Sequence, residues 1–182
     1  MKLIWDSSQF KITIDTIDIH IAPEDHSPFP VNALVEEQDT SLVLEPDDEL
    51  RDPGDDKPIW YDSNKAELLA AHQPGDVLIK SINPIRFLAI VHDLDQTPSW
   101  KSEWIETALS KVFEISDSKS LSAIGIPVLG LQFGRFKLEA FISIFADALK
   151  KQNFEHSLRI WLIVKPEQCQ KAFELLKVFK TL

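Results

Sequence analysis

The second half of the chain alternates between helix-like and strand-like segments, and this alternation limits its fold more than any other feature. Apolar side chains recur with helical spacing over 104–113, 138–149 and 169–179, as is typical of amphipathic helices. Between them, Leu121 to Leu129 and Leu158 to Val164 are short apolar runs that predict buried strands. Helices that alternate with buried strands pack on the faces of a sheet, so the pattern predicts an α/β fold with a mixed sheet.

The first half of the chain predicts further strands. Apolar and polar residues alternate over 12–14 and again, in a shifted phase, over 17–21, which indicates two strands with a bulge or turn near Asp15. Other short strands are expected at 31–35, 41–44, 77–79 and 87–91.

An acidic stretch at about 45–57 separates these strands and is interrupted by prolines and a glycine. It predicts an exposed loop, with calcium binding or a basic protein partner as alternatives, although its Asp spacing does not fit an EF-hand. A short helix is expected after it, with Asn64 as N-cap. No stretch is long enough to act as a linker, so residues 1–182 are expected to form a single domain.

Charge and cysteine content restrict the partners and the compartment. The 29 acidic and 19 basic residues give a net charge of −10, which argues against non-specific binding to nucleic acid or to an anionic membrane. Cys169 is the single cysteine, so no intramolecular disulfide and no cysteine-type zinc site is expected. With no signal peptide or transmembrane run in the sequence, we expect a cytoplasmic protein.

The segment between the strand at 121–129 and the helix at 138–149 is the best candidate for a ligand site. A loop that leaves a strand and enters a helix can present backbone N–H groups to an anion. The candidate ligand-binding residues in it are Leu129, Gly130, Leu131, Gln132, Phe133, Gly134, Arg135 and Phe136. The alternative is a tight strand-to-helix turn with no ligand, because a pair of glycines is a weak signal.

Residues 126–139 resemble the phosphate-binding strand, loop and helix of the macro domain family. Phe87 to His92 is similar to the family strand that ends in Val-Ile-His, and Val31 to Val35 to the strand before its Asn-Ala-Ala-Asn motif. The order of elements is alike over roughly residues 10–180. The resemblance implies a three-layer α/β/α fold with a mixed sheet and a ligand of the ADP-ribose or nucleotide type.

The resemblance also implies two ligand-binding residues outside the loop. Asp39 stands where the family has the second asparagine of its motif, and Asp18 is similar to the aspartate that contacts adenine. An outward-facing strand position is the alternative for Asp18. Glu36-Glu37-Gln38-Asp39 replaces the whole Asn-Ala-Ala-Asn motif, and Gln132 replaces a glycine of the loop.

These departures leave three hypotheses open. The first is a divergent ligand-binding module with degenerate motifs, and the second is a non-catalytic interaction or scaffolding domain that has lost the site. The third is a hydrolase of ADP-ribose derivatives that uses Asp39 or the cluster His92 to Asp95. No nucleophile motif is present, so catalytic residues stay unknown, and neither a cofactor nor a metal is predicted.

Overall fold

The structure is a computed structural model that describes residues 9–42, 44, 72–80 and 83–180. The acidic loop expected at 45–57 and the helix expected after Asn64 lie outside the described residues. No helix within the described ranges is long and apolar enough to cross a membrane.

The described residues form one sheet of seven strands and three α-helices. The strands are β1 (Lys11–Ile14), β2 (Ile17–Ala22), β3 (Ala33–Asp39), β4 (Val77–Lys80), β5 (Ile85–His92), β6 (Ala123–Pro127) and β7 (Leu158–Ile163). The helices are α2 (Ser102–Ser118), α3 (Leu138–Lys151) and α4 (Cys169–Lys180), and a 3₁₀ turn at Pro166–Gln168 leads into α4. The prediction of an α/β fold with a mixed sheet is confirmed.

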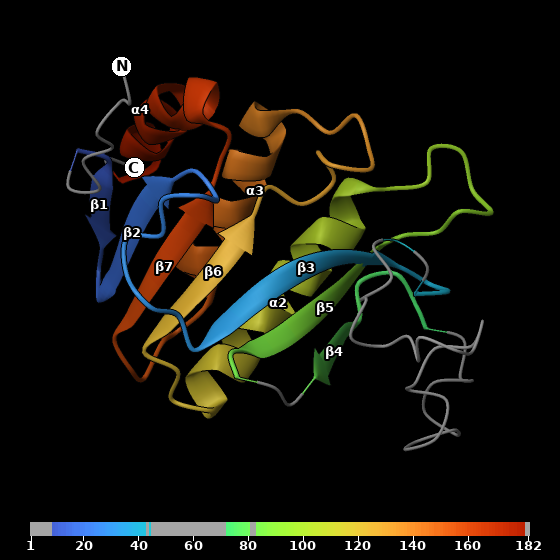
Figure 1. Cartoon of the computed structure of the whole chain (residues 1–182), viewed down its shortest axis with the longest axis horizontal. Helices are drawn as coiled ribbons and strands as arrows, with labels where there is room; N and C mark the ends of the chain where they lie inside the picture. The colour runs from blue at the N-terminus through green and yellow to red at the C-terminus, as the bar shows by residue number, and fades with distance from the viewer. Residues whose placement is uncertain (1–8, 43, 45–71, 81–82, 181–182) are drawn as a thin grey trace.

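The sheet has the strand order β1-β2-β7-β6-β3-β5-β4 (Figure 1). The five central strands are parallel, whereas β1 and β4 pair antiparallel at the two edges. The predicted turn near Asp15 joins β1 to β2, and Asp15 adopts a left-handed φ of 50° there. Because the central strands run in one direction, their carboxyl ends meet along one edge of the sheet.

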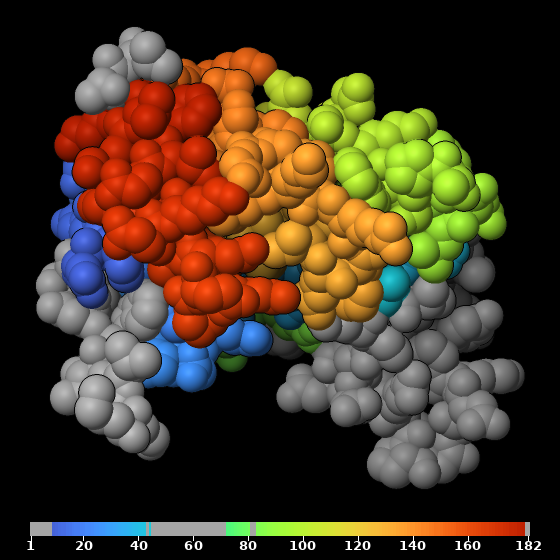
Figure 2. Space-filling view, turned by 90° about the horizontal axis from the view of Figure 1, so that it is seen from above, coloured from blue at the N-terminus to red at the C-terminus, as the bar shows by residue number. Residues whose placement is uncertain are grey.

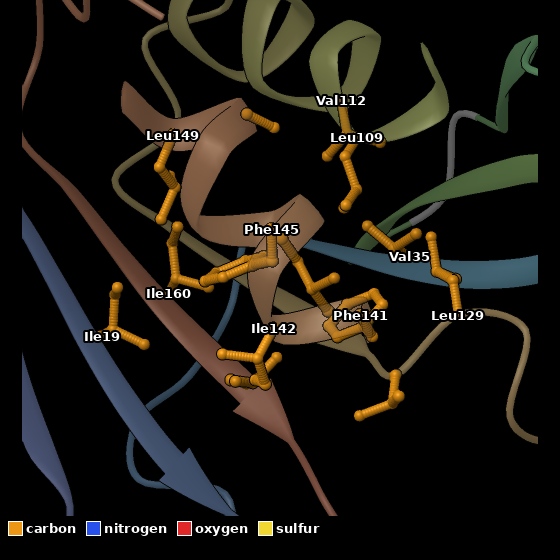
Figure 3. Close-up of a cluster of buried hydrophobic side chains, with 14 of the residues drawn as sticks. Ile19, Val35, Leu109, Val112, Leu129, Phe141, Ile142, Phe145, Leu149 and Ile160 are labelled. Carbon is orange, nitrogen blue, oxygen red and sulfur yellow. The ribbon is translucent and has the colours of Figure 1, made fainter. Parts of the chain in front are cut away.

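The three described helices pack against one face of this sheet. Side chains that alternate along the strands point to this face and join those of the helices in a single core. Figure 3 shows its centre, where α2 and α3 meet the strands, through Ile19, Val35, Leu109, Val112, Leu129, Phe141, Ile142, Phe145, Leu149 and Ile160. Trp104, expected to face inward, stays partly exposed, with the Lys101 ammonium 4.7 Å from its ring centroid.

The opposite face of the sheet is partly covered by the segment that follows β2. There Phe29 packs edge-on against His20 and lies under the Arg159 guanidinium. No helix within the described ranges covers this face, so the second helical layer of a three-layer arrangement stays a prediction.

The prediction of a strand at 41–44 is wrong for the residues that the structure describes there. Ser41 and Leu42 lie in a turn, and Leu42 has a left-handed φ of 57°. The Asp39 carboxylate accepts the Ser41 and Leu44 N–H groups at 2.6 and 2.9 Å, which closes the chain into this turn. A side-chain acceptor therefore replaces the partner strand that these N–H groups would need.

Cys169 lies in the first turn of α4 with no exposed surface, as its place in the apolar stripe predicts. Burial, with a smaller contribution from the charge of Glu167, raises the pKa of its thiol to about 11. Because the reactive species is the thiolate, the thiol stays protonated until the pH approaches that value.

We therefore expect native Cys169 to react with Ellman's reagent at pH 8 on the order of 100-fold more slowly than in urea-unfolded protein. The native rate should climb as the pH is raised toward 11. Equal rates in native and unfolded protein would contradict this assignment.

Candidate functional site

The direction of the chain reverses beside β3, and this reversal marks the place where a site can form. From β3 the chain passes to β4 and β5 on one side, and α2 then carries it across to β6 on the other side. In open α/β sheets a crevice forms at the carboxyl ends of two strands whose connections lead in opposite directions. Here that position lies between the carboxyl ends of β3 and β6.

These two strands separate toward their carboxyl ends. They pair only through Ala33 with Ile124 and Leu34 with Gly125, whereas β3 stays paired with β5 along its whole length (Figure 1). The close approach near Gly125 is tight, since a Cβ there would lie 2.5 Å from Leu34 Cδ2. Beyond this contact, side chains of β3 fill the widening space.

Glu37 fills that space and connects three elements. One oxygen, Oε2, accepts the Gly130 N–H at 2.8 Å, and the other, Oε1, pairs with Nε2 of His92 at the end of β5. The exposed fraction is 2% for the Glu37 side chain and 0% for His92, so the pair is closed to solvent. A buried carboxylate needs such partners, because an unpaired buried charge costs several kcal/mol.

Asp39 organises the chain after β3 in a similar way. Its carboxylate holds the Ser41 and Leu44 N–H groups, while the carbonyl oxygens of Asp39 and His92 accept the N–H groups of Leu42 and Thr40. The N–H groups that follow β3 are thus engaged by the protein itself wherever the structure describes them.

The glycine loop, residues 129–136, has a backbone that requires glycine at two positions. Gly130 has a φ of +79°, and a Cβ there would lie 2.9 Å from Ile105 Cδ1. A Cβ on Gly134 would lie 2.5 Å from the Gly130 carbonyl oxygen and 2.6 Å from Trp100 Cδ1. The loop therefore folds back on itself, and the Phe136 N–H donates to the Gly130 carbonyl at 3.1 Å.

The outer part of this loop contains backbone N–H donors that the described residues do not engage. The N–H groups of Phe133, Gly134 and Arg135 have no hydrogen-bond partner within the described part of the chain. α3 begins at Leu138, directly after the loop, with Lys137 as its exposed N-cap. Consecutive N–H groups beside a helix amino terminus form an environment that favours an anion.

The side chains of the loop divide between core and surface. Leu129 and Phe136 are 0% and 5% exposed, so they belong to the core, and the Phe136 ring packs edge-on against Trp100 at 5.0 Å between centroids. Phe133 is exposed and lies 6.4 Å from the His92 ring. Figure 2 shows the orange surface of the loop next to the yellow-green surface of segment 93–101. Of the two loop phenylalanines, Phe133 is therefore the one that can face a ligand.

The structure does not bring Asp18 to this edge of the sheet. Asp18 is level with Arg159 near the start of β7, at the amino-terminal edge, whereas the loop follows the carboxyl end of β6. Its carboxylate pairs with Lys11 at 2.8 Å and accepts the Thr13 hydroxyl at 2.7 Å, and these contacts lower its pKa. It is a partly exposed strand residue bound to β1.

The cluster His92 to Asp95 is not a joint site either. His92 points inward to Glu37, while Asp93 accepts the Asp95 N–H and the Gln96 side-chain amide at the surface. Asp39 is also fully buried. Within the described ranges, no three His, Cys, Asp or Glu side chains are grouped as they would be around a metal ion.

Glu37 is not among the predicted site residues, because the apolar pattern predicts a strand that ends at Val35. A usable signal was present, since Glu37 continues the alternation of Ala33 and Val35, which places its side chain on the core face. Its partners Gly130 and His92 are far away in sequence, and no spacing rule connects them.

No family model and no curated protein sequence matches this chain. Solved structures do match. A macrodomain of Oceanobacillus iheyensis with ADP is 16% identical, with a TM-score of 0.66 over 94% of each chain. The macrodomain of Thermus aquaticus DarG is 16% identical, with a TM-score of 0.56 over 82% of this chain and 99% of that one.

The macro domain of ganglioside induced differentiation associated protein 2 is 13% identical, with a TM-score of 0.58 over 87% of this chain and 83% of that one. Identities this low show a shared fold alone. The chain has a macrodomain fold, which confirms the α/β fold with a mixed sheet that the resemblance implied.

Because Glu37 has two buried partners, we expect Glu37→Ala to lower the free energy of unfolding by about 3 kcal/mol. Urea denaturation followed by circular dichroism measures this. Glu155→Ala, which removes the same group from an exposed position, should stay within about 0.5 kcal/mol of wild type. Equal effects of the two substitutions would contradict the role assigned to Glu37.

Proposed function

We propose that this chain is a divergent macro-like domain that binds a nucleotide or an ADP-ribose-type ligand. The ligand would lie at the carboxyl ends of β3 and β6, with an anionic group on the glycine loop. The observation that carries this proposal is the row of N–H groups from Phe133 to Arg135, which have no partner in the described part of the chain.

The side chains next to these N–H groups support an anionic ligand that carries a ring. Arg135 and Lys137 are exposed beside these N–H groups and can add positive charge. The exposed Phe133 ring can pack on an adenine or a ribose. The structures of the Oceanobacillus iheyensis macrodomain that share this fold include one with ADP and one with ADPR.

No catalytic step is part of this proposal. Asp39 and His92, the residues considered for hydrolysis, have no exposed surface. Their hydrogen bonds to Ser41, Leu44 and Glu37 account for their positions without a substrate.

Isothermal titration calorimetry with ADP-ribose, AMP and inorganic phosphate tests the proposal directly. We expect saturable heat from at least one of the two nucleotides below millimolar concentration. The absence of heat from all three ligands at millimolar concentration would refute ligand binding by this chain.

A matched pair of arginine substitutions tests the position of the site. Arg135→Gln should weaken nucleotide binding about tenfold, because a charge-assisted contact of roughly 1.5 kcal/mol is lost. Arg159→Gln removes the same charge at the opposite edge of the sheet, where Arg159 covers Phe29, and should leave the affinity unchanged. Equal losses of nucleotide affinity in both variants would indicate a general effect of charge and would contradict the assignment of the loop as the binding site.

An interaction or scaffolding domain is the second candidate. It is favoured by Glu37 and Asp39, which engage N–H groups on both sides of the reversal without any ligand. This reading predicts no nucleotide heat, together with a stable complex in light scattering or co-purification. A monomer that binds neither nucleotide nor protein would contradict it.

A further inference from the structure

At the candidate site, two buried carboxylates of the protein accept backbone N–H groups that an anionic ligand could otherwise bind. Glu37 accepts the first N–H of the glycine loop, that of Gly130, at 2.8 Å. Asp39 accepts two N–H groups of the turn after β3, those of Ser41 and Leu44. Both residues belong to the same strand, and each has 5% or less of its surface exposed.

These contacts reduce the donors that are left for a ligand. Along the loop, the Leu131 N–H donates to the Val128 carbonyl and the Phe136 N–H to that of Gly130, each through a backbone hydrogen bond. After β3, the N–H groups of Thr40 and Leu42 donate to backbone carbonyls as well. Between Gly130 and Phe136, the N–H groups of Phe133, Gly134 and Arg135 have no partner in the described part of the chain.

Three consecutive N–H groups suit one phosphoryl group, because its terminal oxygens can accept all of them. The second phosphoryl group of a diphosphate needs donors of its own. The Gly130 N–H of the same loop already donates to the Glu37 carboxylate, whose other oxygen pairs with His92, so a second anion there would meet a carboxylate oxygen instead of a free donor.

We infer that Glu37 is a specificity-determining residue that restricts this site to ligands with a single phosphoryl group, such as a nucleoside monophosphate. The inference rests on the proposed function and narrows its ligand class. Like charges that are brought together repel, and the repulsion is stronger in a protein-like medium than in water. We therefore expect discrimination of tenfold or more against diphosphates, which corresponds to about 1.4 kcal/mol.

Calorimetric titration of the full chain with AMP, ADP and ADP-ribose tests this inference, since AMP and ADP differ by one phosphoryl group. For wild type we expect AMP to bind at least tenfold more tightly than ADP or ADP-ribose. Glu37→Gln keeps an acceptor for the Gly130 N–H but removes the charge, so the affinities for ADP and ADP-ribose should rise about tenfold toward that of AMP.

Glu36→Gln is the matched control. Glu36 is the adjacent residue of β3, but its side chain pairs with Arg86 on the opposite face of the sheet, so the substitution removes the same charge away from the loop. The ratio of AMP affinity to ADP affinity should equal that of wild type.

The outcomes separate this inference from the proposal beneath it. Wild type that binds ADP or ADP-ribose as tightly as AMP would overturn the inference while leaving nucleotide binding intact. If the wild-type protein prefers AMP but Glu37→Gln leaves the ratio of AMP affinity to ADP affinity unchanged, Glu37 does not determine the preference. The same conclusion follows if Glu36→Gln changes this ratio as much as Glu37→Gln does. Failure of wild type to bind any of the three nucleotides would refute the proposed function, and the inference with it.

Discussion

The buried carboxylate of Glu37 is the interaction on which the candidate site depends. β3 and β6 separate after two residue pairs, and such a separation leaves polar backbone and a widening space inside the molecule. Glu37 fills this space and satisfies the Gly130 N–H on one side and His92 on the other. The loop, β3 and β5 are therefore held together by one charged group whose removal leaves two polar partners buried.

This arrangement links the stability of the domain to the shape of its loop. Gly130 adopts a left-handed φ and packs against Ile105, so the loop has little freedom to rearrange once its first N–H is held. A loop fixed in this way presents its outer N–H groups in place before any ligand arrives. Binding then avoids most of the ordering cost that a flexible loop would add.

The sequence predicted the parts of this molecule that follow from apolar periodicity. The stripe of α3 from Leu138 to Leu149 and the strands around it are found where the pattern placed them. The burial of polar side chains was not predicted. Glu37 and Asp39 are buried because they bind groups that the sequence pattern alone does not place beside them. Phe136 was likewise predicted to bind a ligand, but it packs in the core against Trp100, which lies in a segment far away in sequence.

The net charge of −10 and an anion site on the glycine loop are compatible for a physical reason. Exposed charges farther away than about 10 Å are largely screened at moderate salt, whereas N–H groups act on an anion in direct contact. What decides anion binding is therefore the local count of donors and acids, not the total charge. At this edge of the sheet, Glu37 and Asp39 weaken anion binding in two ways. Each adds a carboxylate, and each also engages N–H donors that a ligand could otherwise use.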